Sequence, residues 1–210
     1  SEYRKFAPLK ALERRDLGRN ALFIGDPLIE GIAPKAGEHE LFGIGKLLAE
    51  KMPEFKWSGI CIPGPHREMP VFRLLADLES FAASQPDKKI PGLVIVSLGG
   101  GDVARQTPLH TFERAIDTLI DRLRFYGAKK IVICGVVPEP WRDKQCAPYQ
   151  ERLSDMLRQH HIDSVDIFSS WTKEETWVRY FWNDKTGKLI APVPNAQARE
   201  NIAEMIKDRI

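Results

Sequence analysis

The chain has 210 residues, of which 43% are hydrophobic and 29% are charged, as in an ordinary soluble globular protein. Its 31 basic and 29 acidic residues are interspersed and leave a formal net charge of +2, which predicts no nucleic-acid or anionic-membrane partner. No apolar stretch approaches the roughly 20 residues that a membrane-spanning helix needs.

A chain of this length suits one α/β domain, which we expect over residues 20–210, after a charged N-terminal arm over residues 1–19. Its 3 cysteines show no metal-ligand spacing, so we expect no metal and no cofactor. The sequence starts without an initiator methionine or a signal peptide, and it leaves the compartment, the oligomeric state and any partner protein open. An extracytoplasmic protein and a part of a longer chain both fit it.

Short apolar runs predict the strands. Residues 22–24 form a continuous apolar run that ends in the turn residues Gly25-Asp26-Pro27, as expected of a strand buried on both faces of a parallel sheet. Residues 94–96 and 131–133 have the same character, so we expect these strands to lie side by side in the centre of the sheet. The predicted strands cover residues 22–24, 55–62, 93–98, 130–137 and 162–168.

Helices are predicted between the strands, from apolar positions that recur on one helical face. Residues 169–194 form an irregular, aromatic-rich segment, after which Asn195 can cap a closing helix. The alternation of strand and helix predicts a single three-layer α/β/α domain with a doubly wound, mainly parallel five-stranded sheet. The predicted helices cover residues 40–51, 70–84, 109–126 and 148–160 and the stretch from Asn195 to the C-terminus.

The loops that follow the strands define the candidate ligand cleft, because in such sheets ligands bind outside the carboxyl ends of the strands. Trp141 lies in one of these loops, after Pro138-Glu139-Pro140, and is the best candidate for a ligand contact. The candidate cleft residues are Gly25, Asp26, Pro27, Gly64, His66, Gly99, Gly100, Gly101, Asp102 and Trp141.

Two features of these loops have more than one interpretation. The run Gly99-Gly100-Gly101 can form a nest of backbone amides for an anion, as in a flavodoxin-like nucleotide binder, or can simply permit a tight turn. Asp26 and Asp102 can together hold a divalent cation, but we favour hydrogen bonds from backbone amides that shape the two turns.

The order of these motifs resembles the SGNH (GDSL-like) hydrolase family over about residues 20–210. Gly25-Asp26 follows the first strand as in the family's Gly-Asp-Ser block, and Gly99 and Asp102 match its Gly-x-Asn-Asp block. The stretch 193–206 is similar to the end of the family's last block and the helix that follows. The resemblance implies acyl transfer, in which a histidine activates the serine and backbone amides with the asparagine side chain hold the oxyanion.

This sequence departs from the family at each catalytic position. Pro27 stands in place of the serine, and Gly101 in place of the oxyanion asparagine. Ile190 and Val193 stand where the last block, Asp-x-x-His, has its aspartate and histidine. The sequence therefore predicts a non-catalytic member that binds a ligand, a carbohydrate or an acyl ester, or a partner.

An esterase or acylhydrolase with migrated catalytic residues is the alternative. Cys61 and His66 can form a thiol nucleophile with its base, although such residues more often have no catalytic role. Asp184 offers a replacement acid but has no histidine to orient. The aromatic residues within 171–182 form either a lid packed on the sheet edge, which we favour, or a stacking surface for a sugar or an acyl chain.

Overall fold

The described residues form one parallel sheet in the computed structural model, which describes residues 12–25, 43–61, 70–183, 185–189 and 194–210. The strand order is β2-β1-β3-β4-β5. The three continuous apolar runs lie in β1, β3 and β4, neighbouring strands whose apolar side chains are almost entirely buried, so the predicted centre of the sheet is confirmed. The strands are β1 (Asn20–Gly25), β2 (Lys56–Cys61), β3 (Leu93–Ser97), β4 (Lys130–Cys134) and β5 (Asp163–Val165).

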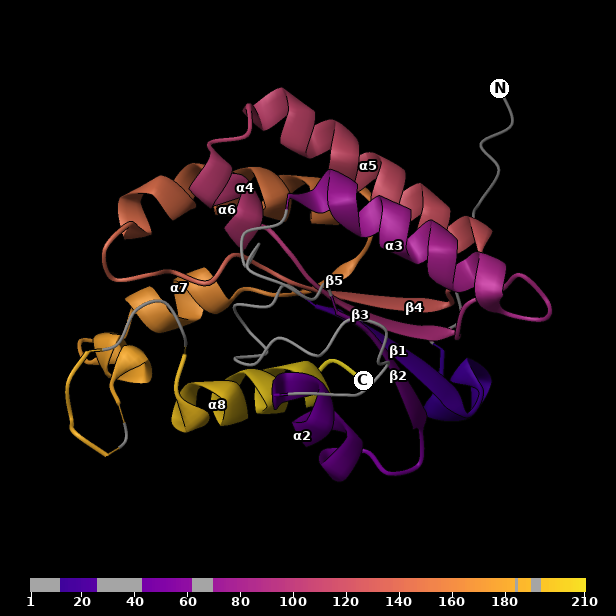
Figure 1. Cartoon of the computed structure of the whole chain (residues 1–210), viewed down its shortest axis with the longest axis horizontal. Helices are drawn as coiled ribbons and strands as arrows, with labels where there is room; N and C mark the ends of the chain where they lie inside the picture. The colour runs from indigo at the N-terminus through magenta and orange to yellow at the C-terminus, as the bar shows by residue number, and fades with distance from the viewer. Residues whose placement is uncertain (1–11, 26–42, 62–69, 184, 190–193) are drawn as a thin grey trace, which may run out of the picture.

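Helices cover both faces of this sheet, which confirms the three-layer architecture (Figure 1). Alternate strand residues point to opposite faces, so Leu22 and Val94 pack under one helical layer while Phe23 and Ile95 pack under the other. The first layer contains α3 (Val71–Ser84), α5 (Leu109–Phe125) and α6 (Asp143–Gln159), and the second contains α2 (Gly43–Lys51), α7 (Ile167–Thr172) and α8 (Ala196–Lys207). Shorter helices are η1 (Arg14–Leu17), α4 (Gly100–Arg105) and η2 (Trp177–Phe181).

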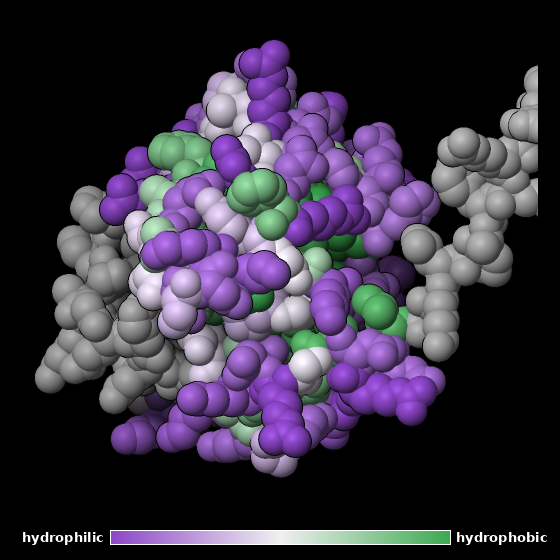
Figure 2. Space-filling view, turned by 90° about the vertical axis from the view of Figure 1, so that its right-hand side faces the viewer, coloured by the Kyte–Doolittle hydropathy of each residue, from purple (hydrophilic) through white to green (hydrophobic). Residues whose placement is uncertain are grey.

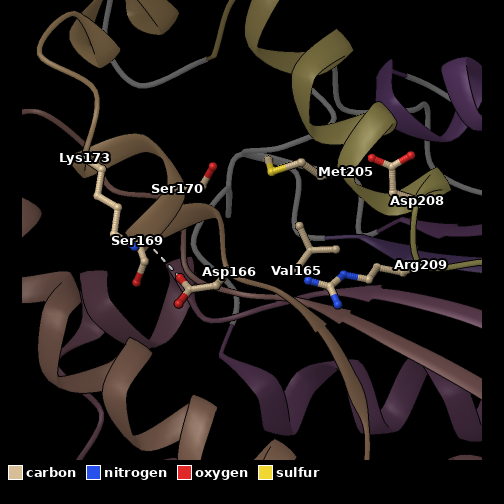
Figure 3. Close-up of a pocket in the computed structure, with 8 residues that line it drawn as sticks. All are labelled: Val165, Asp166, Ser169, Ser170, Lys173, Met205, Asp208 and Arg209. Atoms are coloured by element: carbon tan, nitrogen blue, oxygen red, sulfur yellow. Dashed lines mark hydrogen bonds between the residues drawn. The ribbon is translucent and has the colours of Figure 1, made fainter.

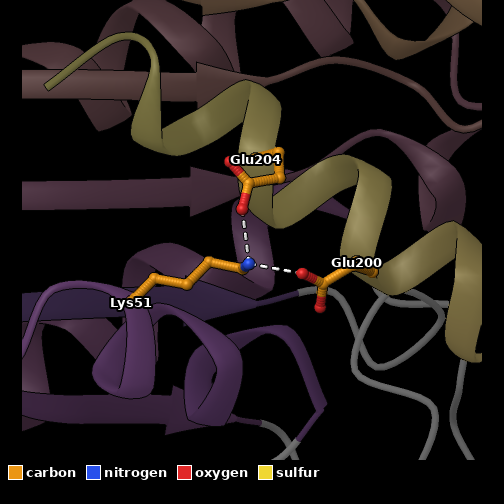
Figure 4. Close-up of polar contacts among 3 residues, drawn as sticks. All are labelled: Lys51, Glu200 and Glu204. Carbon is orange, nitrogen blue, oxygen red and sulfur yellow. Dashed lines mark hydrogen bonds and ion pairs between the residues drawn. The ribbon is translucent and has the colours of Figure 1, made fainter.

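Ion pairs join α2 to α8 on the outer side of the second layer. The ammonium group of Lys51 donates to carboxylate oxygens of both Glu200 and Glu204 (Figure 4). These hydrogen bonds raise the pKa of Lys51 above its ordinary value, because they stabilise the charged form. The two helices therefore meet through charge as well as through the apolar side chains between them.

Several predicted boundaries are wrong, and each error has a local cause. Gly99 adopts φ 105° and caps a short helix, so the predicted glycine turn continues as α4. The fifth strand ends at Val165, because the Asp166 side chain accepts a hydrogen bond from the Ser169 amide and starts α7. Helix α6 begins at residue 143 and contains Pro148, whereas the sequence placed the helix start at that proline.

The surface that lies at right in Figure 1 faces the viewer in Figure 2. Hydrophilic side chains dominate its described part, and apolar ones occur among them in small groups, as expected from the interspersed charges of the sequence. Among the described residues, no helix has the length and apolar character needed to cross a membrane.

Candidate functional site

The carboxyl ends of the strands bring residues from distant parts of the chain side by side. Gly25 at the end of β1 is the register partner of Cys61 at the end of β2. Cys134 at the end of β4 is the partner of both Ser97 and Val165. The strand ends from which the predicted cleft residues follow therefore form one continuous row.

Part of the predicted site lies outside the described residues. The backbone of Cys61 is described, and its side chain is not. The Cys61–His66 dyad and a cation held jointly by Asp26 and Asp102 therefore stay predictions. The predicted residues that lie outside the described ranges are Asp26, Pro27, Gly64, His66, Asp184, Ile190 and Val193.

After β3 the chain turns sharply into α4. Gly99 is buried, and a methyl group added at its Cα would lie 2.7 Å from the Cγ2 atom of Val136, which belongs to the loop after β4. Gly100 begins the helix, and Gly101 is buried in its first turn. Gly101 thus offers no side-chain donor to an oxyanion, as its position in the sequence predicted.

Asp102 is buried and joins α4 to α3. Its side chain is 1% exposed, and its Oδ2 atom accepts a hydrogen bond of 2.9 Å from the backbone amide of Val71, the first residue of α3. Burial raises the pKa of Asp102, while hydrogen bonds from Val71 and the Thr107 hydroxyl and the charge of Arg105 oppose that rise. The Asp102 side chain therefore accepts a hydrogen bond from the first amide of α3, and not from a backbone amide of the turn in which Asp102 lies.

We expect Asp102→Ala to destabilise the protein by about 1–3 kcal/mol, because the Val71 amide would lose its buried acceptor.

Asp102→Asn keeps an acceptor and cannot ionise. Because the folded-state pKa of Asp102 is raised, wild-type stability falls as the pH rises from the ordinary aspartate value through the folded-state value. Asp102→Asn should therefore gain stability relative to the wild type between pH 3 and pH 7, measured by urea denaturation. A constant difference across that range would contradict the role of burial.

Trp141 lies in the loop after β4 and is 42% exposed. Its ring meets that of Phe181 edge to face, with the ring centroids 5.6 Å apart. Phe181 is fully buried and in turn contacts the fully buried Trp171. The exposed indole thus rests on a rigid aromatic base, an arrangement that suits a ligand contact.

The aromatic-rich segment is mainly core. Trp171 and Phe181 are fully buried and Tyr180 is 3% exposed, as the packed-lid interpretation expects, whereas Trp182 is 46% exposed. The Nε1 atom of Trp171 donates a 2.8 Å hydrogen bond to Asn201 of α8, which fixes the segment on the second layer.

A buried ion pair beside Trp141 holds the same loop. Glu139 is 4% exposed, and its carboxylate accepts a hydrogen bond from the Nε atom of Arg142. Arg142 was not identified from the sequence as the partner of Glu139. The spacing of three residues between opposite charges was the available signal.

The described residues contain no hydrogen bond between a serine or cysteine and a histidine. Ser97 is fully buried at the end of β3, and burial raises the pKa of the Cys134 thiol to about 12, which disfavours its reactive thiolate near neutral pH. The imidazole of His160 lies 2.6 Å from Asp117 of α5. No group of three or more potential metal-binding side chains occurs in the described ranges. The described residues at the strand ends hold no assembled nucleophile and base.

The comparisons with known proteins agree with this architecture. Residues 23–207 match the model of the GDSL-like lipase/acylhydrolase family. No curated protein matched the sequence. The chain is similar to a member of the lipolytic protein G-D-S-L family from Veillonella parvula, with a TM-score of 0.66 and 13% identity over 90% of this chain and 96% of the other.

Two acetylxylan esterases are also similar in structure. One, AlAXEase, has a TM-score of 0.68 and 14% identity over 91% of this chain and 99% of the other. A catalytic mutant of the enzyme from Geobacillus stearothermophilus has a TM-score of 0.65 and 15% identity over 91% and 94% of the two chains. At these identities the likeness establishes the fold.

Proposed function

Since the chain belongs to the GDSL-like lipase/acylhydrolase family, we propose that it is a member that binds an acylated carbohydrate without hydrolysing it. The observation that carries the proposal is Pro27, which stands where the family has its nucleophilic serine. A proline side chain has no hydroxyl group and cannot attack an ester.

The other catalytic positions support the same conclusion. Val193 offers no base, Ile190 offers no carboxylate to orient one, and Gly101 offers no side-chain donor. Loss of one oxyanion donor alone costs about 100- to 1,000-fold in rate. With the nucleophile and base also replaced, the family's acyl-transfer reaction has no residue at these positions to carry it.

The ligand class follows from the cleft and from the structural relatives. Trp141 presents a half-exposed indole on a buried aromatic base, and indole faces stack well on sugar rings. Two of the similar structures are esterases of acetylxylan, an acetylated carbohydrate. An ester with its sugar against Trp141 and its acyl group toward Gly25 would follow the row of strand ends.

One experiment tests binding and chemistry together. Purified protein is titrated with acetylated xylo-oligosaccharides by calorimetry, and acetate release is measured in the same mixtures. We expect saturable binding without acetate release. Trp141→Ala should weaken binding about tenfold, equivalent to about 1.4 kcal/mol. Phe125→Ala is the control, because Phe125 is 74% exposed on α5 and belongs to no part of the cleft.

The variant Pro27→Ser should also release no acetate, because a serine hydroxyl needs an adjacent base to become a nucleophile. Acetate release by the wild type that Cys61→Ala or His66→Ala abolishes would overturn the proposal. It would establish the second candidate function, an esterase with a migrated dyad. That candidate draws on the pairing of Cys61 with Gly25 at the base of the cleft.

A further inference from the structure

A hollow lies at the carboxyl end of β5, the edge strand of the sheet. It has a volume of about 620 Å³, within the range of about 300–1,000 Å³ usual for small-molecule sites. Val165 at the end of β5, one side of α7 and the end of α8 form its walls (Figure 3). None of the candidate cleft residues lines it.

Two cationic side chains enter this hollow from different elements. Lys173 follows α7 and Arg209 follows α8, and Figure 3 shows them reaching inward from opposite sides. Within the described ranges, neither side chain makes an ion pair or a hydrogen bond. Two positive charges thus line one small space without an ion-pair partner among the described residues.

Two carboxylates, Asp166 and Asp208, also line the hollow, but neither forms an ion pair with Lys173 or Arg209. Asp166 accepts a hydrogen bond of 2.9 Å from the Ser169 amide and is thereby committed to starting α7. Asp208 points away from the guanidinium group of Arg209 in Figure 3, and the two side chains form no ion pair. The cationic groups are therefore available to a ligand.

The remaining lining residues fit an anion carried on a small organic body. The hydroxyl groups of Ser169 and Ser170 are half-buried donors on α7. Val165 and Met205 supply apolar surface in the same hollow. A phosphate dianion matches two positive charges, and arginine holds phosphate through paired N–H donors.

We propose that this hollow binds a small organic phosphate, with Arg209 and Lys173 holding the phosphate group, the serine hydroxyls donating to its remaining oxygens and the organic part lying on Val165 and Met205. None of the candidate cleft residues lines this hollow, so binding here does not depend on the carbohydrate proposal.

The test is an NMR titration of the full ¹⁵N-labelled chain with inorganic phosphate and with phenyl phosphate. We expect saturable shifts centred on residues 165–173 and 205–209, with phenyl phosphate binding more tightly because it also covers apolar surface. Arg209→Gln and Lys173→Gln should each weaken binding at least tenfold. Ser169→Asp, which adds a negative charge in the hollow, should abolish it.

Lys144→Gln is the matched control, since Lys144 is an exposed lysine on α6 that does not line the hollow. It should leave the affinity unchanged. Equal weakening by Lys144→Gln, shifts centred on other residues, or no saturation at millimolar phosphate would each overturn the proposal. Unfolding transitions of the variants that match the wild type confirm that any loss of binding is local.

Discussion

Trp171→Ala is expected to lower the free energy of unfolding by about 3–5 kcal/mol, as large aromatic-to-alanine changes in a core do. Trp171 is fully buried, and its ring centroid lies 4.6 Å from that of Tyr180 and 6.1 Å from that of Phe181. The variant opens a cavity between η2 and α8, and it also leaves the side-chain oxygen of Asn201 without its indole donor. Urea denaturation of the purified variant measures the loss.

Two further variants separate the causes. Trp171→Phe keeps most of the packing and loses the hydrogen bond to Asn201, so it should cost about 1–3 kcal/mol. Trp182→Ala removes an indole that is 46% exposed and should cost well under half as much as Trp171→Ala. Similar losses for Trp171→Ala and Trp182→Ala would mean that the aromatic segment is not held by its buried ring.

Trp171→Ala should also weaken ligand binding at Trp141. Trp141 rests on Phe181, and Phe181 rests on Trp171, so a cavity at Trp171 removes the support of the exposed indole. Carbohydrate binding should therefore weaken in Trp171→Ala even under conditions where the variant is fully folded.

Gly99→Ala is expected to destabilise the protein by about 2–4 kcal/mol. A residue with a side chain costs about 1–2 kcal/mol in the left-handed region that Gly99 occupies at φ 105°. The new methyl group would also lie 2.7 Å from the Cγ2 atom of Val136, and such overpacking typically costs about 1–3 kcal/mol. Thermal and urea unfolding both measure the change.

Gly187→Ala provides the matched control for this prediction. Gly187 also has a positive φ, 63°, but apart from its own chain neighbours no described residue has an atom within 4 Å of the position that its Cβ would take. It should therefore show the backbone cost alone. In the double variant Gly99→Ala, Val136→Ala, the steric part should be relieved, so the two losses should not add. Strict additivity would show that Val136 does not limit the space at Gly99.

The central part of the fold could be predicted from the sequence because its signals are local and redundant. Residues 22–24, 94–96 and 131–133 are apolar without alternation and are followed by turn residues or the chain's next loop, a pattern typical of strands covered on both faces. Asn195 lies before an amphipathic helix, and its side chain does accept the hydrogen bond of an N-cap, from Ala198. Such features depend on few distant contacts.

The errors arise where one residue can serve two structures. A glycine run favours a turn, but Gly99 at a positive φ also allows α4 to begin at once. Residues Ile167 and Phe168 suit a strand by composition, yet Asp166 ends the strand by capping α7. Pro148 suits a first turn but lies inside α6, whose start depends on the loop that Glu139 and Arg142 fix. The Trp141–Phe181 contact joins segments 40 residues apart and has no local signal.

The contact between α2 and α8 has a consequence for the order in which the chain assembles. The ion pair from Lys51 to Glu200 spans 149 residues of sequence, and closing so long a loop costs entropy before any contact forms. The neighbouring strands β3 and β4 close a much shorter segment. Folding should therefore begin among the strands and the first layer, and α8 should dock late onto a sheet already formed. In the native protein α2 and α8 should also open together, so their amides should exchange with solvent at a common rate that is faster than in β3.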